Sequence, residues 1–266
     1  MTSDPEVTLT EKSRAVEIIL DRLLPKIEGP ESLLASAMQH ATLGRRVHPN
    51  GFLVCASAQL FSVDPVRALR VAAAVECAFE CSTIHDDLPC MDDIGDRWEQ
   101  PSVHVKFGEA TAILAGDALS ALAFELLASE STHEDPSVRC QLIAGLSEAV
   151  GGHGAVGGQI HELLPIGSEA DIGEITRLQQ MKTGALLAFS SEAGGILGHA
   201  TRDSRHALRA FAHDLGLAWQ IMSDVQAEGR KGKRKIGQKG IFRDCSRSRQ
   251  SANTGKNFGP SSSRTP

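Results

Sequence analysis

Apolar residues recur along most of the chain at spacings of three and four positions, which is typical of helices with one buried face. The stretch 9–26 places five aliphatic residues on one such face: Val16, Ile19, Leu20, Leu23 and Leu24. We find no hairpin pattern, because no two alternating apolar runs are joined by a turn signal such as Asn-Gly. The pattern therefore predicts an all-α fold.

The most apolar of the predicted helices begins after Asp64, a favourable N-cap that is followed by proline at the first helical position. It runs to about Asp87 and is apolar on nearly every side between Val71 and Ile84, so we expect most of its surface to be buried. Further helical patterns follow over residues 110–128, 137–150, 168–197 and 204–226.

The helical pattern ends after Glu228. Residues 229–266 have few large apolar side chains and end in glycine, proline and serine, which is typical of disorder. This stretch holds eleven lysines and arginines against one aspartate, a charge of +10, whereas the rest of the chain holds 16 basic and 32 acidic residues. We therefore expect a helical domain, residues 1–228, and a basic disordered tail, residues 229–266.

The remaining composition indicates a soluble, cytoplasmic protein. No apolar run approaches the roughly 18 residues that a transmembrane segment needs, and the first residues lack a signal-peptide pattern. Six cysteines match no CxxC pattern, so we expect no structural metal. The basic tail could bind the phosphates of nucleic acid or membranes. Because basic runs are more often simply solvated, we expect no nucleic-acid partner.

The buried helix ends in a cluster of acids, within the sequence CSTIHDDLPCMDD at positions 81–93. At about 100° per residue, Asp87 lies about 100° round the helix from Asp86, whereas Asp92 points about 120° the other way. Pro89 should end the helix and allow Asp92 to turn back toward the pair. Clustered carboxylates must raise their pKa values or recruit a cation, and oxygen ligands alone favour Mg²⁺. The alternative is a solvated acidic loop.

Further motifs surround this cluster. The segment IHDDLPCMDD is preceded by LGRRVHP and followed by HVKFGEATAILAGDAL, GGQIHEL, MKTGALL and GLAWQIMSD. Together they resemble the trans-isoprenyl diphosphate synthases over about residues 10–228, and most closely the short-chain bacterial type that makes farnesyl or geranylgeranyl diphosphate. The resemblance implies a helical bundle around a central cavity, and a homodimer. It also implies a Mg²⁺-dependent condensation of isopentenyl diphosphate with an allylic diphosphate, which ionises first.

The resemblance also implies roles for individual residues. The magnesium ligands would be four aspartates: Asp86, Asp87, Asp92 and Asp224. The allylic diphosphate would be held on its leaving-group side, where catalysis takes place, by Arg97, Lys182, Thr183 and Gln220. Isopentenyl diphosphate would be bound by Gly44, Arg45 and His48.

Product length in this family is set below the first aspartate motif, where this chain has Cys81 and Ser82. Both are small, which implies a deep cavity and geranylgeranyl diphosphate, the C20 product, in preference to C15 farnesyl diphosphate. Phe79 and Phe107 could still shorten the pocket.

The chain departs from the family pattern at several charged positions. The second aspartate motif, DDxxD in the family, reads SDVQA, with Ser223 and Ala227 in place of two aspartates. Two arginines of the family pattern are replaced by Trp98 and His48, and a histidine is replaced by Phe79. The basic tail stands in place of the C-terminal part of the pattern, as in a C-terminally truncated or frame-shifted chain. A second hypothesis is therefore a non-catalytic or decayed relative that acts at most as a partner subunit. A terpene cyclase, which shares the ionisation step, is a third.

Overall fold

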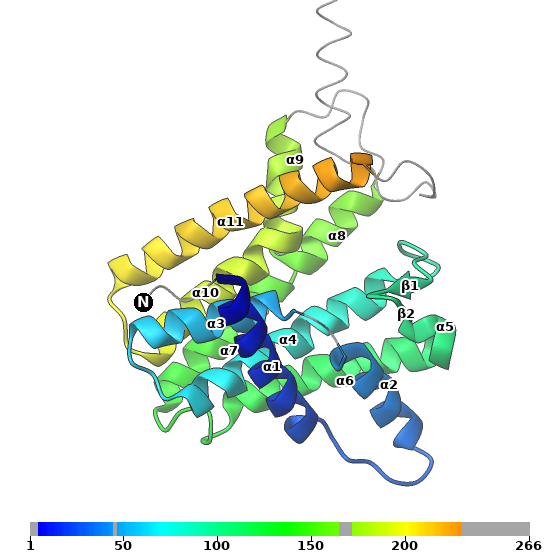
Figure 1. Cartoon of the computed structure of the whole chain (residues 1–266), viewed down its shortest axis with the longest axis horizontal. Coiled ribbons are helices and arrows are strands. Elements are labelled where there is room, and N and C mark those ends of the chain that lie inside the picture. The colour runs from blue at the N-terminus through cyan, green and yellow to red at the C-terminus, as the bar shows by residue number, and fades with distance from the viewer. Residues whose placement is uncertain (1–4, 45–46, 165–171, 230–266) are drawn as a thin grey trace, which may run out of the picture.

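The computed structural model describes residues 5–44, 47–164 and 172–229 (Figure 1). These residues form the helices α1 (Pro5–Leu23), α2 (Ser32–Thr42), α3 (Pro49–Leu60), α4 (Pro65–Asp86), α5 (Val103–Phe107), α6 (Glu109–Ala128), α7 (Pro136–Val150), α8 (Ala155–Leu163), α9 (Ile172–Gln179), α10 (Ala185–Leu197) and α11 (Arg202–Gly229). A short antiparallel hairpin, β1 (Asp96–Arg97) and β2 (Gln100–Pro101), lies between α4 and α5. The prediction of an all-α fold is confirmed, although it did not include the hairpin.

Helix α4 runs through the middle of the fold and packs against both α3 and α6 (Figure 1). Its N-terminus is capped by Asp64, whose side chain accepts a hydrogen bond from the backbone N–H of Val66 at 2.7 Å. All residues from Val71 to Val75 are fully buried, so the prediction that this helix is buried on most sides is confirmed. A helix held in this way fixes the position of the acidic residues at its end.

Helix α10 is the second central helix, and all its residues from Leu186 to Leu197 are buried. It packs against α3, α7 and α11. A π-helical turn, η1 (Gln180–Gly184), joins α9 to α10. Such turns add one residue to a helical turn and are frequent at functional sites. This one carries Lys182 toward the acidic end of α4.

Gly194 allows α10 to pack closely on α3. A Cβ atom at this position would lie 2.1 Å from the backbone nitrogen of Ala58 and 2.3 Å from Oγ of Ser57. Because neither atom belongs to a flexible chain end, we expect G194A to force the helices apart and to lower the free energy of unfolding by about 3 kcal/mol. Urea unfolding measures this change. G152A, whose new Cβ would meet nothing within 4 Å, is the control. Equal stability of the two variants would contradict the close approach.

Helix α6 is apolar and only partly covered. By length and composition this helix could cross a membrane, but the core helices of soluble proteins share these properties. It packs against α2, α4, α5 and α7, yet much of its apolar surface is not covered. Ile113 and Leu114 therefore stay exposed.

The predicted basic tail, residues 229–266, lies outside the described residues apart from Gly229, which ends α11.

Candidate active site

The acidic cluster lies where α4 ends and the chain folds back. Asp86 is the last residue of α4 and Asp87 is its C-cap. The backbone N–H of Asp92 donates a hydrogen bond to the carbonyl oxygen of Asp86 at 2.9 Å, and the N–H of Ile94 donates to that of Asp87 at 3.1 Å. The loop that contains Pro89 therefore returns Asp92 to the end of α4, as the sequence predicts.

The ammonium group of Lys182 lies among three carboxylates. Its Nζ is 2.5 Å from Oε2 of Glu162, 3.6 Å from Oδ2 of Asp86 and 4.0 Å from Oδ2 of Asp92. Asp86 ends α4, Asp92 lies in the loop that follows it, Glu162 lies in α8 and Lys182 in η1. The four side chains are 16% to 24% exposed. Because they are largely screened from water, their mutual attraction and repulsion are stronger than on an open surface.

Glu162 was not among the predicted site residues, although the sequence contains a signal for it. Gly158 precedes it by one turn of α8, and a Cβ atom at Gly158 would lie 2.6 Å from the backbone nitrogen of Lys182. Glycine therefore lets α8 pack directly on η1, and the spacing of four residues brings the carboxylate of Glu162 to the same side. The Gly-Gly pair followed by an acid in GGQIHEL is the pattern that indicates this residue.

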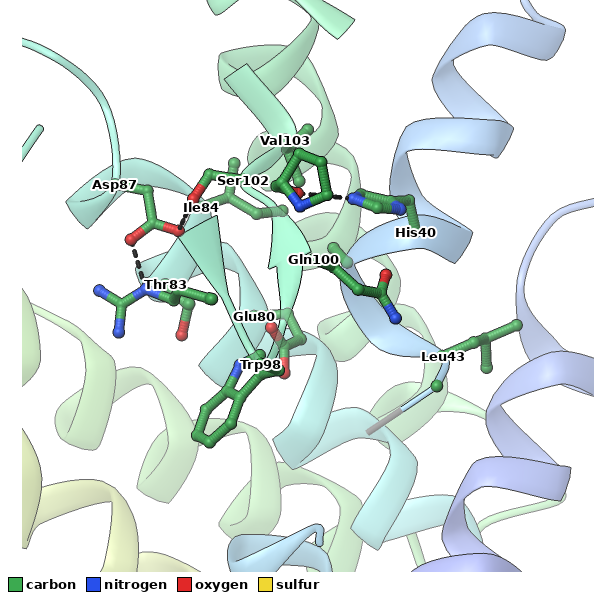
Figure 2. A pocket seen from close by; sticks show the side chains of 14 residues that line it. His40, Leu43, Glu80, Thr83, Ile84, Asp87, Trp98, Gln100, Ser102 and Val103 are labelled. Atoms are coloured by element: carbon green, nitrogen blue, oxygen red, sulfur yellow. Dashed lines mark hydrogen bonds and ion pairs between the residues drawn. The ribbon is translucent and has the colours of Figure 1, made fainter. Parts of the chain in front are cut away.

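Asp87 belongs to a different set of contacts. It is only 3% exposed, and its two oxygens accept hydrogen bonds from Nε of Arg97 and, at 3.1 Å, from Oγ of Ser102 (Figure 2). Arg97 lies in β1 and Ser102 is the N-cap of α5, so Asp87 fastens both elements to α4. The structure thus separates the three aspartates of the first motif: Asp86 and Asp92 face Lys182, whereas Asp87 faces Arg97.

The protonation of the cluster is set by burial and by Lys182. Burial raises the pKa of Asp86 to about 6, although the charge of Lys182 acts in the opposite direction. Burial also raises the pKa of Asp92, again against the attraction of Lys182. For Lys182 itself, burial acts to lower the pKa, but Asp86 and Glu162 outweigh burial and raise it. One ammonium group therefore does not fully compensate the three carboxylates.

Replacing Lys182 with glutamine is expected to raise the pKa of Asp86 further, because the ammonium group is the strongest influence that lowers it. The pKa of Asp86 is about 6 in the folded protein and 3.8 in the unfolded chain. The protonated carboxyl group therefore contributes most to stability below pH 3.8, and this contribution is lost as the pH rises to about 6. In K182Q, the pH range over which the protein loses this stability should extend to higher pH. Carbon-13 NMR titration of the aspartate carboxyls measures the pKa, and urea unfolding at several pH values measures the stability.

K26Q is the matched control for this prediction, since Lys26 is an exposed lysine that pairs with Asp21. It should leave the pKa of Asp86 unchanged. An Asp86 carboxyl that titrates near the ordinary aspartate value in the unchanged protein would contradict the expected effect of burial.

The oxygen atoms of the cluster suit a hard cation. Within the ranges that the structure describes, no three histidine, cysteine or acidic side chains converge closely enough to form a ready-made metal site. The carboxylates of Asp86, Asp92 and Glu162 instead share the ammonium group of Lys182. Asp86 and Asp92 still offer carboxylate oxygens in a place where more positive charge is favourable. Mg²⁺ usually binds through one or two carboxylates together with substrate phosphates, so these two aspartates fit it.

Asp87 and Arg97 also line a small pocket of about 40 Å³, which we call the hairpin pocket (Figure 2). Its other lining residues come from α2 and the segment after it, from α4, from the hairpin and from the start of α5, and they include His40, Gly44, Glu80, Trp98 and Gln100. The backbone N–H of Gly44 donates a hydrogen bond to Oε1 of Glu17 at 2.6 Å. Gly44 and Arg97, which the sequence assigns to the two diphosphates, therefore lie at one pocket.

Three other predicted residues are half-buried: Thr183 in η1, and Cys81 and Ser82 on α4. Three predicted positions cannot be placed, because the structure does not describe Arg45 or the side chains of Gln220 and Asp224.

His48, which we expected to bind isopentenyl diphosphate, lies in the core instead. It is 1% exposed, and its Nδ1 is 3.2 Å from Oε2 of Glu76. Glu76 is fully buried and also accepts a hydrogen bond from the backbone N–H of Gly51 at 2.7 Å. A buried carboxylate requires such partners, and His48 is one of them. We therefore do not retain His48 among the proposed substrate-binding residues.

Comparison with known proteins identifies the family of the chain. The polyprenyl synthetase family model matches residues 31–254. Farnesyl diphosphate synthase of Geobacillus stearothermophilus is 38% identical over 222 residues, which cover 83% of this chain and 74% of that protein. The crystal structure of an FPP/GFPP synthase from Zymomonas mobilis is 39% identical and superimposes with a TM-score of 0.81, over 96% of this chain and 93% of that one.

Geranylgeranyl pyrophosphate synthase 11 of Arabidopsis thaliana is 39% identical, over 68% of this chain and 52% of that protein. These relatives are all named as prenyl diphosphate synthases, and they differ in the product for which they are named. The chain therefore belongs to the polyprenyl synthetase family of prenyltransferases, among the short-chain trans-isoprenyl diphosphate synthases.

Proposed function

We propose that the protein is a Mg²⁺-dependent prenyltransferase that joins isopentenyl diphosphate to an allylic diphosphate. The convergence of Asp86, Asp92 and Lys182 at the end of the apolar helix α4 carries this proposal. Two carboxylates that fit Mg²⁺, beside a lysine, suit a diphosphate leaving group. The buried helix that leads to them suits a hydrocarbon chain. Isopentenyl diphosphate binds at the hairpin pocket, beside Gly44.

When bound together with the substrate, Mg²⁺ neutralises the diphosphate and makes it a better leaving group. Lys182 exchanges its carboxylate partners for a phosphate oxygen, and Thr183 donates a hydrogen bond to the same group. The allylic C–O bond then breaks, and the allylic carbon bonds to the terminal alkene carbon of isopentenyl diphosphate, which leaves a tertiary cation. A proton on the neighbouring carbon passes to the departing diphosphate, and the electron pair of that C–H bond forms the new double bond. Apolar side chains of α4 keep water away from the cation.

For the product we propose geranylgeranyl diphosphate. Cys81 and Ser82 precede Asp86 by about one turn of α4, and both are small and half-buried. Small side chains at these positions take up little space below the acidic cluster, which favours a longer product chain. Phe79, which packs against the core, limits that room. Farnesyl diphosphate is the alternative, supported by the names of several relatives.

We also propose a homodimer in which a second copy covers α6. Ile113 and Leu114 are 44% and 58% exposed on this apolar helix, and contiguous apolar surface usually marks an interaction site. L114D is expected to convert the dimer to a monomer in sedimentation velocity, because the new charge would be buried without a partner. L60D changes another leucine, 71% exposed at the end of α3, and should leave the dimer intact. If the L114D protein is still a dimer, α6 is not the dimer interface.

Turnover tests the proposed activity. Purified protein is incubated with radiolabelled isopentenyl diphosphate and with dimethylallyl, geranyl or farnesyl diphosphate, in MgCl₂ or in EDTA, and the products are separated by reversed-phase chromatography. We expect a C20 product that forms only with Mg²⁺. A C15 product would correct the chain length alone. A hydrocarbon formed without isopentenyl diphosphate would indicate a cyclase.

A non-catalytic relative is the second candidate, and Ser223 and Ala227 in the second motif favour it. Dimethylallyl diphosphate that binds in calorimetry but yields no product would support this candidate. Mixing the protein with an intact synthase then tests for a partner subunit, which would change the rate or the product length of that synthase.

A further inference from the structure

His40 connects three elements around the hairpin pocket through its two ring nitrogens. It lies in the last turn of α2. Its Nε2 is 2.8 Å from the carbonyl oxygen of Pro101 in β2, and its Nδ1 is 3.1 Å from Nζ of Lys106 in α5 (Figure 2 shows the first contact). The ring of Phe107 meets the imidazole edge to face, with centroids 5.4 Å apart. His40 therefore joins α2 to both the hairpin and α5.

The two partners determine where the imidazole carries its proton. The ammonium group of Lys106 can only donate, so Nδ1 of His40 must accept. The carbonyl oxygen of Pro101 can only accept, so Nε2 must donate. Both hydrogen bonds are satisfied together only by a neutral imidazole with its proton on Nε2.

The hairpin needs such support from outside. Each strand has two residues, and a hairpin of this size has little stability of its own. Both residues of its turn, Trp98 and Glu99, have positive φ angles of 53° and 64°, a conformation that is costly for residues with side chains. Arg97 ties the hairpin to the end of α4, and Pro101 ties it to α2 through His40.

We propose that His40 is a positioning residue for the second diphosphate substrate. By holding β2 against α2, it fixes the spacing between Gly44, at the end of α2, and Arg97 in β1. These segments are in close contact, since a Cβ atom at Gly44 would lie 3.1 Å from Nε2 of Gln100. The proposal rests on the proposed function, in which isopentenyl diphosphate binds at this pocket.

Two substitutions separate the two hydrogen bonds. H40Q keeps a donor for Pro101, whereas H40N keeps an acceptor for Lys106 and loses that donor. In a W219F background, Trp98 is the sole tryptophan, and its fluorescence reports the position of the hairpin. We expect H40N to shift this emission and to raise KM for isopentenyl diphosphate about tenfold, as for one lost hydrogen bond, with little change in kcat. H40Q should remain close to the parent protein.

H206N is the matched control, because His206 is exposed on α11. Nitrogen-15 NMR of the imidazole adds a measurement that does not depend on turnover: we expect the proton on Nε2, and a mixture of tautomers in K106M. A proton on Nδ1, or equal fluorescence and KM for H40N and H206N, would overturn the proposal. If the parent protein makes no product, the proposed function fails, and the tautomer and the Trp98 emission alone decide the role of His40.

Discussion

Replacing Asp86 with asparagine is expected to lower kcat by about 10²- to 10³-fold, as for the loss of one group that stabilises charge in a transition state. Asparagine has nearly the same size, so D86N removes the charge and preserves the packing of α4. Of the two aspartates that face Lys182, Asp86 is the nearer, at 3.6 Å against 4.0 Å for Asp92. Because its carboxylate is buried at some cost, thermal unfolding should show no loss of stability in D86N.

Asp93 offers a matched control in the same motif. Its side chain is exposed, and its φ angle of 50° lies in a region that asparagine adopts as readily as aspartate. D93N therefore makes the same chemical change without touching the cluster around Lys182, and we expect nearly normal kcat. Steady-state kinetics over a range of MgCl₂ concentrations compares the two variants. If D86N has the same kcat as the parent protein, Asp86 does not take part in catalysis.

Restoring two acids to the second motif, in the double variant S223D/A227D, is expected to raise kcat about tenfold or more. The family pattern at this place is DDxxD, and this chain has Asp224 as its one aspartate there. Positions 223 and 227 are one turn apart on α11, so the two new carboxylates would share a face of the helix. Further oxygen ligands would bind more Mg²⁺ and stabilise the departing diphosphate.

The variant A207D/A218D adds the same charge at exposed positions of α11 and separates a general charge effect from a local one. If S223D/A227D is no faster than the parent, the second motif does not limit the rate. Glu162 is then the carboxylate to test next, since it already lies 2.5 Å from Lys182. In that case E162Q should reduce turnover as strongly as D86N.

Local signals were sufficient to predict the elements that carry the site. The proline after Asp64 and the largely apolar stretch from Val71 to Ile84 correctly indicated a buried central helix. Pro89 correctly indicated that the chain turns back after the helix. In each case the cause lies within a few residues of its effect, so that spacing along the chain is enough to identify it.

Contacts between distant segments could not be read in the same way. Glu162 reaches Lys182 because α8 packs on η1 at Gly158, and His48 is drawn into the core because Glu76 of α4 needs a donor there. From the sequence alone, both Glu162 and Glu76 could equally have been solvated surface residues. The destination of such polar groups depends on which helices meet. The motif GGQIHEL marks Glu162 but does not identify Lys182 as its partner, and no motif indicated that His48 pairs with Glu76.

The position of Lys182 gives the protein an internal counter-ion. This lysine already neutralises part of the charge that Mg²⁺ would neutralise, so free metal gains little by displacing it. A diphosphate changes that balance, because the ammonium group then finds another acceptor in a phosphate oxygen. Under the proposed function, metal and substrate should therefore enter as one chelate, and turnover would follow the concentration of that chelate rather than the level of free magnesium.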